Sequence, residues 1–144
     1  MNISRGYWYS IVMVTGIMAG VLPAHTMATK CTCQAALACG ADDCSPAGEN
    51  GNDARKSCES VSATINTKTS ELSICAFNDC WKGTAKAVEI GNSSTMWHGD
   101  FPRNSNANST SSHVALFLKD GVGFAQVSDE SGPLQLSLTC QTNN

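Results

Sequence analysis

Residues 113–140 read HVALFLKDGVGFAQVSDESGPLQLSLTC and contain three segments in which apolar and polar side chains alternate. Asp120-Gly121 separates the first two segments, and both residues tolerate the positive φ angles that a two-residue type I′ turn requires. A second turn sequence, residues 128–132, precedes the third segment. The pattern predicts an antiparallel meander of three strands whose large side chains bury one another: Leu116, Leu118, Phe124, Leu134, Leu136 and Leu138.

Similar alternation precedes the meander in four shorter segments, residues 61–66, 72–76, 82–90 and 95–101. The inward face of residues 82–90 is ambiguous, because either the alanines or the larger side chains can point into the core. Turn residues separate the segments, and no helical period is present. The sequence therefore predicts an all-β fold, a small antiparallel β-barrel or sandwich of about seven strands.

Residues 1–28 have the layout of a secretory signal peptide. One basic residue precedes the uncharged apolar residues 9–24, and small residues follow. The apolar run is shorter than the roughly 20 residues that a membrane-spanning helix needs. We expect cleavage after Ala28, with Ala24 as the alternative. The mature protein, residues 29–144, should then be secreted or periplasmic, fold as one unit and have no contact with the membrane.

All eight cysteines of the chain lie in the predicted mature protein. An even number of cysteines behind an export signal predicts a disulfide framework. Zinc binding by the first four is the alternative, because thiolates are good zinc ligands, but their spacing lacks the paired C-x₂-C pattern of zinc sites. The predicted disulfide cysteines are Cys31, Cys33, Cys39, Cys44, Cys58, Cys75, Cys80 and Cys140.

The mature chain divides into two regions of different composition. Residues 29–60 are rich in Cys, Gly, Ala and Asp and show no sustained apolar period, which predicts a cysteine-rich loop region. Residues 61–144 form the predicted antiparallel β-domain. Two disulfides can be local, whereas the last cysteine needs a distant partner: Cys39–Cys44, Cys75–Cys80, and Cys140 with Cys31, Cys33 or Cys58.

The charge and the motifs of the chain restrict its function. A net charge of −3 with scattered charged residues is not typical of a nucleic-acid-binding protein. The sequence has no G-x-S-x-G, no H-E-x-x-H and no phosphate-binding glycine loop, so we expect neither an enzyme nor a cofactor. His98 and Asp100 share one face of a predicted strand and, with His113, are the candidate metal ligands. We expect an exposed polar strand face here rather than a metal site, because the sequence has no further motif that supports one.

A polar loop, residues 102–112 (PRNSNANSTSS), interrupts the predicted strands and is expected to be mobile. Loops on a rigid scaffold often carry binding function, so the leading hypothesis is a non-enzymatic binding module with a protein partner. Asn92 and Asn108 match the glycosylation acceptor pattern, and their modification is left open. Trp81 and Trp97 are expected to fill the core rather than to bind sugar.

The general plan of export signal, cysteine-rich region and compact β-domain resembles that of small periplasmic inhibitor and immunity proteins such as the lysozyme inhibitors. The resemblance is architectural and implies an inhibitor-like or immunity-like function. Ser131-Gly132 lacks the aromatic residue that the lysozyme-inhibitor pattern places after this step. Two other functions remain open: a metal-binding protein or metal-assisted hydrolase, and a structural envelope protein without a specific ligand.

Overall fold

The computed structural model describes residues 27–47, 55–104, 106 and 108–143, and its secondary structure is β apart from one short 3₁₀ turn. No helix in this part of the chain is long and apolar enough to cross a membrane. Almost all of the predicted signal peptide lies outside the described residues. The elements are β1 (Ala28–Cys39), β2 (Cys44–Pro46), η1 (Lys56–Cys58), β3 (Ser62–Asn66), β4 (Glu71–Ala76), β5 (Asp79–Thr84), β6 (Lys86–Glu89), β7 (Ser94–Pro102), β8 (Ser111–Lys119), β9 (Val122–Asp129) and β10 (Gly132–Asn143).

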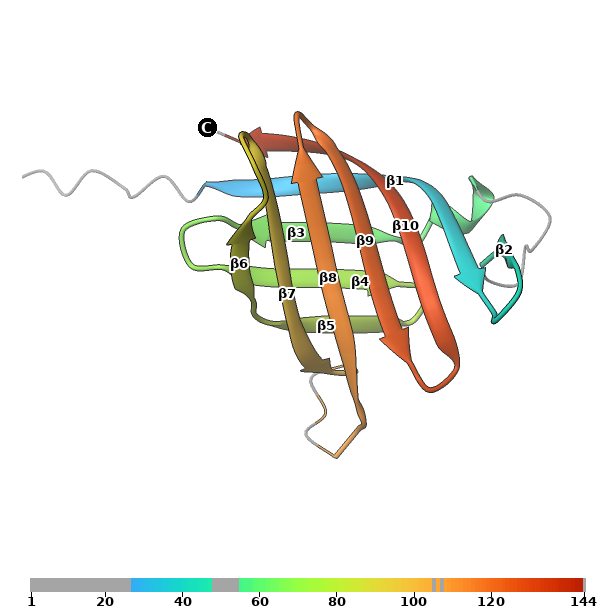
Figure 1. Ribbon diagram of the computed structural model, residues 1–144. Coiled ribbons are helices and arrows are strands. Elements are labelled where there is room, and N and C mark those ends of the chain that lie inside the picture. Colours follow the sequence, from blue (N-terminus) through green and yellow to red (C-terminus); the bar gives the residue numbers. More distant parts are fainter. Residues whose placement is uncertain (1–26, 48–54, 105, 107, 144) are drawn as a thin grey trace, which may run out of the picture.

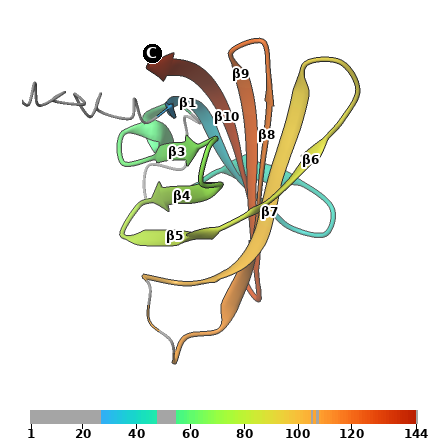
Figure 2. The same ribbon diagram turned by 90° about the vertical axis from the view of Figure 1, so that its left-hand side faces the viewer.

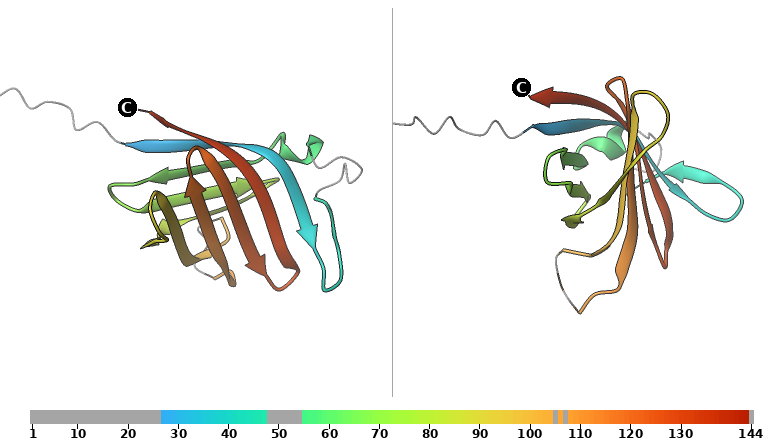
Figure 3. Two further views of the ribbon diagram at one scale, coloured as in Figure 1. Left: turned by 45° about the horizontal axis from the view of Figure 1, so that its top comes forward. Right: turned by 60° about the vertical axis from the view of Figure 1, so that its left-hand side comes forward.

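The strands form one antiparallel sheet in the order β5-β4-β3-β1-β10-β9-β8-β7-β6, and β2 pairs with the far end of β1. Strands β3, β4 and β5 form one layer, and strands β7 to β10 cross in front of them (Figure 1). The side view separates the two layers, which the long strands β1 and β10 join (Figure 2). The hairpin of β1 and β2 projects away from both layers (Figure 3). The sheet is a nearly closed barrel, which confirms the predicted fold class; the described residues contain ten strands, whereas the sequence predicted about seven.

The predicted meander is present as β8, β9 and β10. Asp120 and Gly121 have φ angles of 49° and 80°, and β8 and β9 pair from Lys119 opposite Val122 onward. These values confirm the two-residue turn. Because a two-residue turn fixes the register of a hairpin, it also decides which residues of β8 and β9 face the barrel interior.

Residues 82–90, predicted as one strand, are divided between two strands that pair with different neighbours. β5 pairs with β4, and β6 pairs with β7. The change occurs at Ala85, which is buried and donates its N–H to the carbonyl of Ser70 at 2.8 Å. This division also explains why the sequence did not show which face of residues 82–90 points inward: Ala85 is buried, whereas Ala87 in β6 is exposed.

Phe101 fills the seam where β5 lies beside β7. Its ring occupies the space that side chains at Gly83 and Gly99 would need: a Cβ there would lie 2.5 Å and 2.8 Å from ring carbons of Phe101. One isolated backbone bridge between Trp81 and Arg103 also crosses this seam. The barrel therefore closes here by side-chain packing, with one bridge in place of a continuous ladder.

The core contains large side chains from both layers, and the two tryptophans belong to it as predicted. Trp81 is 3% exposed and Trp97 is 6% exposed. The largest fully buried side chains are Ile65, Leu72, Ile74, Leu116, Leu136, Leu138, Val114 and Val127.

The predicted burial of Phe124 is wrong. Phe124 is 41% exposed on the outer surface, and its neighbours Gly123 and Ala125 face the interior instead. A Cβ at Gly123 would lie only 2.8 Å from Sγ of Cys140, so this interior position has no room for a side chain. The sulfur of Cys140 therefore occupies interior space in which the alternation of the sequence had predicted the ring of Phe124.

The prediction of loops for residues 29–60 is wrong over the length of β1, the longest stretch in which the predicted and observed secondary structure differ. β1 is a strand of 12 residues that pairs with both β3 and β10 and lies in the middle of the sheet. Its register shifts between Cys33 and Ala35. The interior residues are therefore Thr29 and Cys31 before this bulge and Ala36 after it, which breaks the two-residue period in the sequence.

All eight cysteines form disulfides, which confirms the predicted framework. Such a framework is typical of extracellular and periplasmic proteins. Three of the four bonds join residues that lie directly opposite each other in antiparallel pairs of strands. The two predicted local pairs are present, and Cys31 is the distant partner of the last cysteine: Cys31–Cys140, Cys33–Cys58, Cys39–Cys44 and Cys75–Cys80.

Candidate functional site

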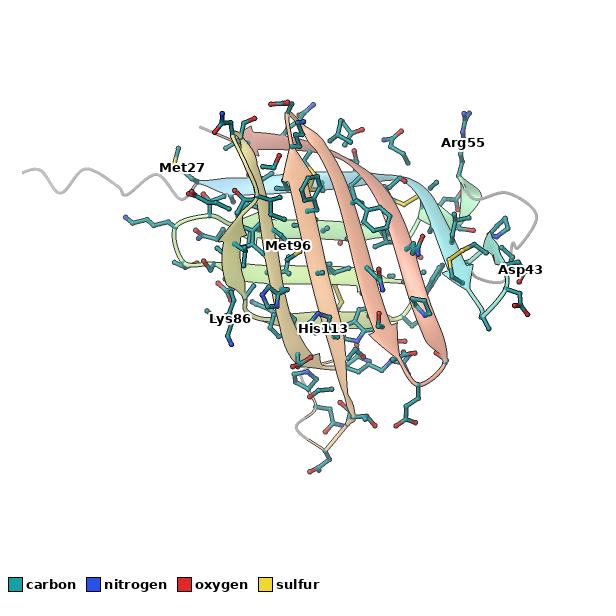
Figure 4. The ribbon with its side chains drawn as sticks, viewed as in Figure 1. Met27, Asp43, Arg55, Lys86, Met96 and His113 are labelled. Carbon is teal, nitrogen blue, oxygen red and sulfur yellow. A yellow bond between two sulfur atoms is a disulfide. The ribbon has the colours of Figure 1, made fainter. Side chains whose placement is uncertain are left out.

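The predicted metal ligands meet on the outer face of β7 and β8. Asp100 and His113 are directly opposed across the two strands, and Oδ1 of Asp100 lies 2.9 Å from Nδ1 of His113. The rings of His98 and His113 are 5.9 Å apart. Figure 4 shows His113 on β8 together with Met96 on β7 and Lys86 on β6; Lys86 lies opposite His98, whereas Met96 lies opposite Phe117, away from His113.

This outer cluster has little of the character of a metal site. The side chains of His113 and Asp100 are 54% and 72% exposed, so solvent screens their interaction. Within the described part of the chain, no group of three or more His, Cys, Asp or Glu side chains has an arrangement that could hold a metal ion. The four cysteines of the alternative zinc site all form disulfides, so none of them is a free thiolate. The residues lie together as the pattern indicated, and the arrangement is that of an exposed polar strand face.

The loop between β7 and β8 is attached to β5 by hydrogen bonds. Asn104 donates its backbone N–H to the carbonyl of Cys80 at 2.7 Å and accepts the N–H of Cys80 through Oδ1 at 2.8 Å. Its Nδ2 also donates to Asp79 at 3.0 Å. The side chain of Asn104 therefore supplies hydrogen bonds between the β7–β8 loop and β5 where no backbone pairing joins β7 to β5. Cys80 is also linked to β4 by its disulfide with Cys75.

Further contacts attach the described residues of the loop to the barrel and to one another. Arg103 forms an ion pair with Asp79 at 2.7 Å, and its guanidinium carbon lies 6.0 Å from the centre of the Trp81 ring. Ser109 donates its hydroxyl to the carbonyl of Asn106 at 2.7 Å, and its N–H donates to the same carbonyl at 2.9 Å. Asn104 has a positive φ of 53°, which an asparagine tolerates better than most residues.

A polar cavity of about 400 Å³ lies between this loop and the β9–β10 turn. We call this end of the barrel the loop end; its described residues are 103, 104, 106, 108–110 and 129–131. Both segments lie at the bottom of Figure 1. The cavity lining combines hydroxyl and amide groups with one guanidinium and two carboxylates: Arg103, Asn108, Ser109, Thr110, Ser111, Ser112, Asp129, Glu130 and Ser131.

A second, smaller cavity of about 180 Å³ adjoins the first and shares three of its residues, Arg103, Asp129 and Ser131. Its other walls are largely apolar and include Phe77 and Leu134. The β9–β10 turn between the cavities is held by Asp129, whose Oδ1 accepts the backbone N–H of Ser131 at 2.8 Å. The loop end thus has a polar cavity beside a more apolar one, which suits recognition of a ligand with both kinds of surface.

The sequence predicted the loop as a binding element but not the turn that faces it. Residues 129–131 are distant from the loop in sequence, and only the register of β8 with β9 brings them to the same end of the barrel. Apolar side chains on the outer face of β8 and β9 were also missed: Phe124, which is 41% exposed, lies directly opposite the half-buried Phe117, and Val122 is 66% exposed. Asn92 and Asn108 are exposed, as acceptors of glycans must be.

Comparison with known proteins adds no assignment to these observations. No protein-family model matches the chain, and no curated protein or solved structure matches it either.

Proposed function

We propose that the protein is an exported, non-enzymatic binding module that recognises a protein partner through the loop end of its barrel. The observation that carries the proposal is the polar cavity of about 400 Å³ between the β7–β8 loop and the β9–β10 turn. An inhibitor-like or immunity-like role is the form of this function that agrees with the general plan of the chain.

The scaffold supports this proposal because it fixes the binding surface before a partner arrives. Asn104 and Arg103 attach the loop to β5, and β5 is crosslinked to β4 by Cys75–Cys80. A loop that is ordered in advance loses little conformational entropy on binding, which raises affinity. Hydroxyl, amide and charged groups such as those that line this cavity are typical of the polar parts of protein interfaces.

The compartment is part of the proposal. We propose export by residues 1–28 to the periplasm or the extracellular space, where four disulfides form and persist. The intact mass of the exported protein, measured with and without reduction and alkylation, should correspond to residues 29–144 with eight oxidised cysteines. A mass that retains residues 1–28, or that shows free thiols, would contradict this part of the proposal.

The partner can be tested by capture with two matched charge reversals. Glu130 is exposed and lines the polar cavity, whereas Glu89 is exposed on β6, outside the residues that line it. The exported protein and its Glu130→Lys and Glu89→Lys variants would be immobilised and exposed to extracts of the same compartment. We expect a protein that the parent and Glu89→Lys retain and that Glu130→Lys loses, because a misplaced charge at an interface costs several kcal/mol.

Two outcomes of the capture experiment would refute the proposal. The first is that no protein is retained specifically by the parent. The second is that both charge reversals release the captured protein to the same extent, since the contact would then not depend on the loop end. Circular dichroism of the variants would verify that each retains its β structure.

A further inference from the structure

Phe77 has a backbone conformation that aromatic residues rarely adopt. A two-residue turn, Phe77-Asn78, joins β4 to β5, because Ala76 pairs directly with Asp79. Phe77 has a positive φ of 58°, whereas Asn78 does not have a positive φ. A positive φ at the first turn residue alone defines a type II′ turn, which favours glycine at that position. A bulky residue there is strained, and such strain is concentrated at functional sites.

The turn that carries Phe77 is held in place from both strands. Cys75 and Cys80 are directly opposite each other beside the turn and form a disulfide. The Phe77 side chain nevertheless remains 37% exposed. The turn therefore presents an aromatic ring partly to solvent, and aromatic residues are enriched in the centres of protein interfaces.

Phe77 lines the second cavity of the loop end, which has a volume of about 180 Å³. The other apolar walls include Trp81, Val127, Pro133 and Leu134. The volume is below the 300–1,000 Å³ range of sites that hold a whole small-molecule ligand. The cavity therefore suits a single apolar side chain of a larger partner.

The charged residues around the two cavities leave the loop end negative. Asp79, Arg103, Asp129 and Glu130 line them, and one positive and three negative charges give a net charge of −2. Arg103 is neutralised by its ion pair with Asp79. Within the part of the chain that the structure describes, neither Asp129 nor Glu130 forms an ion pair. The unmatched charge beside the apolar cavity is therefore negative, and a cation of a partner complements it.

We propose that the β4–β5 turn belongs to the protein-binding surface of the loop end, and that its apolar cavity receives an apolar side chain of the partner that is adjacent to a lysine or arginine. The apolar side chain packs on Phe77, and the cation lies near Glu130. The two cavities share lining residues, so neighbouring residues of one partner segment can reach both. This inference rests on the proposed function, because it assigns a chemistry to the partner that binds the same end of the barrel.

Short peptides titrated into the ¹⁵N-labelled exported protein test this chemistry. Three tetrapeptides with blocked ends and serine at both ends would be compared, with the central pairs leucine–lysine, leucine–glutamate and serine–lysine. We expect the leucine–lysine peptide to shift the amide signals of Phe77 and Ser131 to saturation. The leucine–glutamate peptide should bind about fivefold more weakly, because an exposed ion pair is lost. The serine–lysine peptide should bind about tenfold more weakly, because it buries no apolar side chain.

The Phe77→Gly variant separates a binding role of Phe77 from a structural one. Glycine adopts the positive φ without strain, so the midpoint temperature of unfolding should stay the same or rise. The leucine–lysine peptide should bind this variant about tenfold more weakly, because the ring on which leucine packs is gone. Phe124→Ser is the matched control, since Phe124 is 41% exposed and lies outside the lining of both cavities. This control should bind the peptide as the parent does.

The inference fails if the three peptides bind the parent protein equally or not at all, a comparison that depends on no variant. It also fails if Phe77→Gly binds the peptide as well as the parent. A markedly lower unfolding midpoint of Phe77→Gly would overturn it too, because the ring would then serve stability. A protein captured through Glu130, together with peptides that do not differ, would refute this inference alone. A preference among the peptides without any captured protein would refute the proposed function alone.

Discussion

Removal of the Cys31–Cys140 disulfide should destabilise the protein far more than removal of Cys39–Cys44. The first bond closes a loop with a sequence separation of 109 residues, and the second closes one of 5. Chain-entropy arguments relate the stabilisation to the logarithm of loop length, which gives about 5 kcal/mol for the long loop and about 2 kcal/mol for the short one. The expected difference of about 3 kcal/mol is a large fraction of the 5–15 kcal/mol that stabilises a typical domain.

Packing acts in the same direction as loop entropy. Cys31 and Cys140 are buried, and the space beside Gly123 is occupied by Sγ of Cys140. Alanine at both positions would leave a cavity there, which adds to the loss. Cys44, in contrast, is exposed, so its replacement removes less buried contact.

The assay is urea unfolding of two double variants, Cys31→Ala/Cys140→Ala and Cys39→Ala/Cys44→Ala, followed by tryptophan fluorescence. The free energy of unfolding in water should fall by about 5 and about 2 kcal/mol respectively. Complete unfolding of the first variant beside a folded second variant would also agree with this order. Equal losses in the two variants, or a larger loss in the second, would refute the reasoning from loop length.

Two further substitutions test how the barrel closes and how the loop is held. Gly83→Ala should destabilise the protein by about 1–3 kcal/mol in thermal unfolding, because its methyl group would collide with the ring of Phe101, whereas Gly40→Ala, whose Cβ would meet nothing closer than 3.8 Å, should have little effect. Asn104→Ala should accelerate hydrogen exchange of the Cys80 amide, which loses its acceptor, while global stability falls by only about 1 kcal/mol. Unchanged exchange at this amide would show that the side chain of Asn104 does not hold the loop.

The sequence was most informative where local chemistry and regular alternation agreed. Asp120-Gly121 permits positive φ at both positions, and the structure has the two-residue turn and the paired strands that this requires. The alternation of Trp97 and Phe101 around Gly99 likewise placed both aromatic rings in the core. In these segments a residue's own conformational preference and its burial indicate the same structure.

The errors arose where tertiary contacts decide which way a side chain points. The bulge between Cys33 and Ala35 moves the inward positions of β1 by one residue, so the strand shows no regular period. Phe124 faces outward because the sulfur of Cys140 occupies the interior opposite Gly123. No local pattern records either effect, since both depend on a strand distant in sequence.

The candidate sites were predictable only in part for the same reason. The β7–β8 loop is visible as a polar segment, but its cavity also requires residues 129–131, which the register of β8 and β9 brings beside it. For Asp100 and His113, in contrast, the alternation predicted correctly that the side chains lie together. Their exposure to solvent, which the alternation does not show, makes them poor candidates for a metal site.

The arrangement of cavities follows from how this barrel closes. Phe101 and the Trp81–Arg103 bridge seal the seam beside β5, and the disulfide of Cys31 and Cys140 crosslinks the long strands β1 and β10. Large side chains fill the middle of the barrel, and cavities lie at its two ends. The loop end is built from a long loop and a turn, which can offer a broad surface to a protein. At the opposite end a cavity of about 220 Å³ lies beside the β6–β7 and β8–β9 turns, which contribute Ser93, Asp120 and Gly121 to its lining.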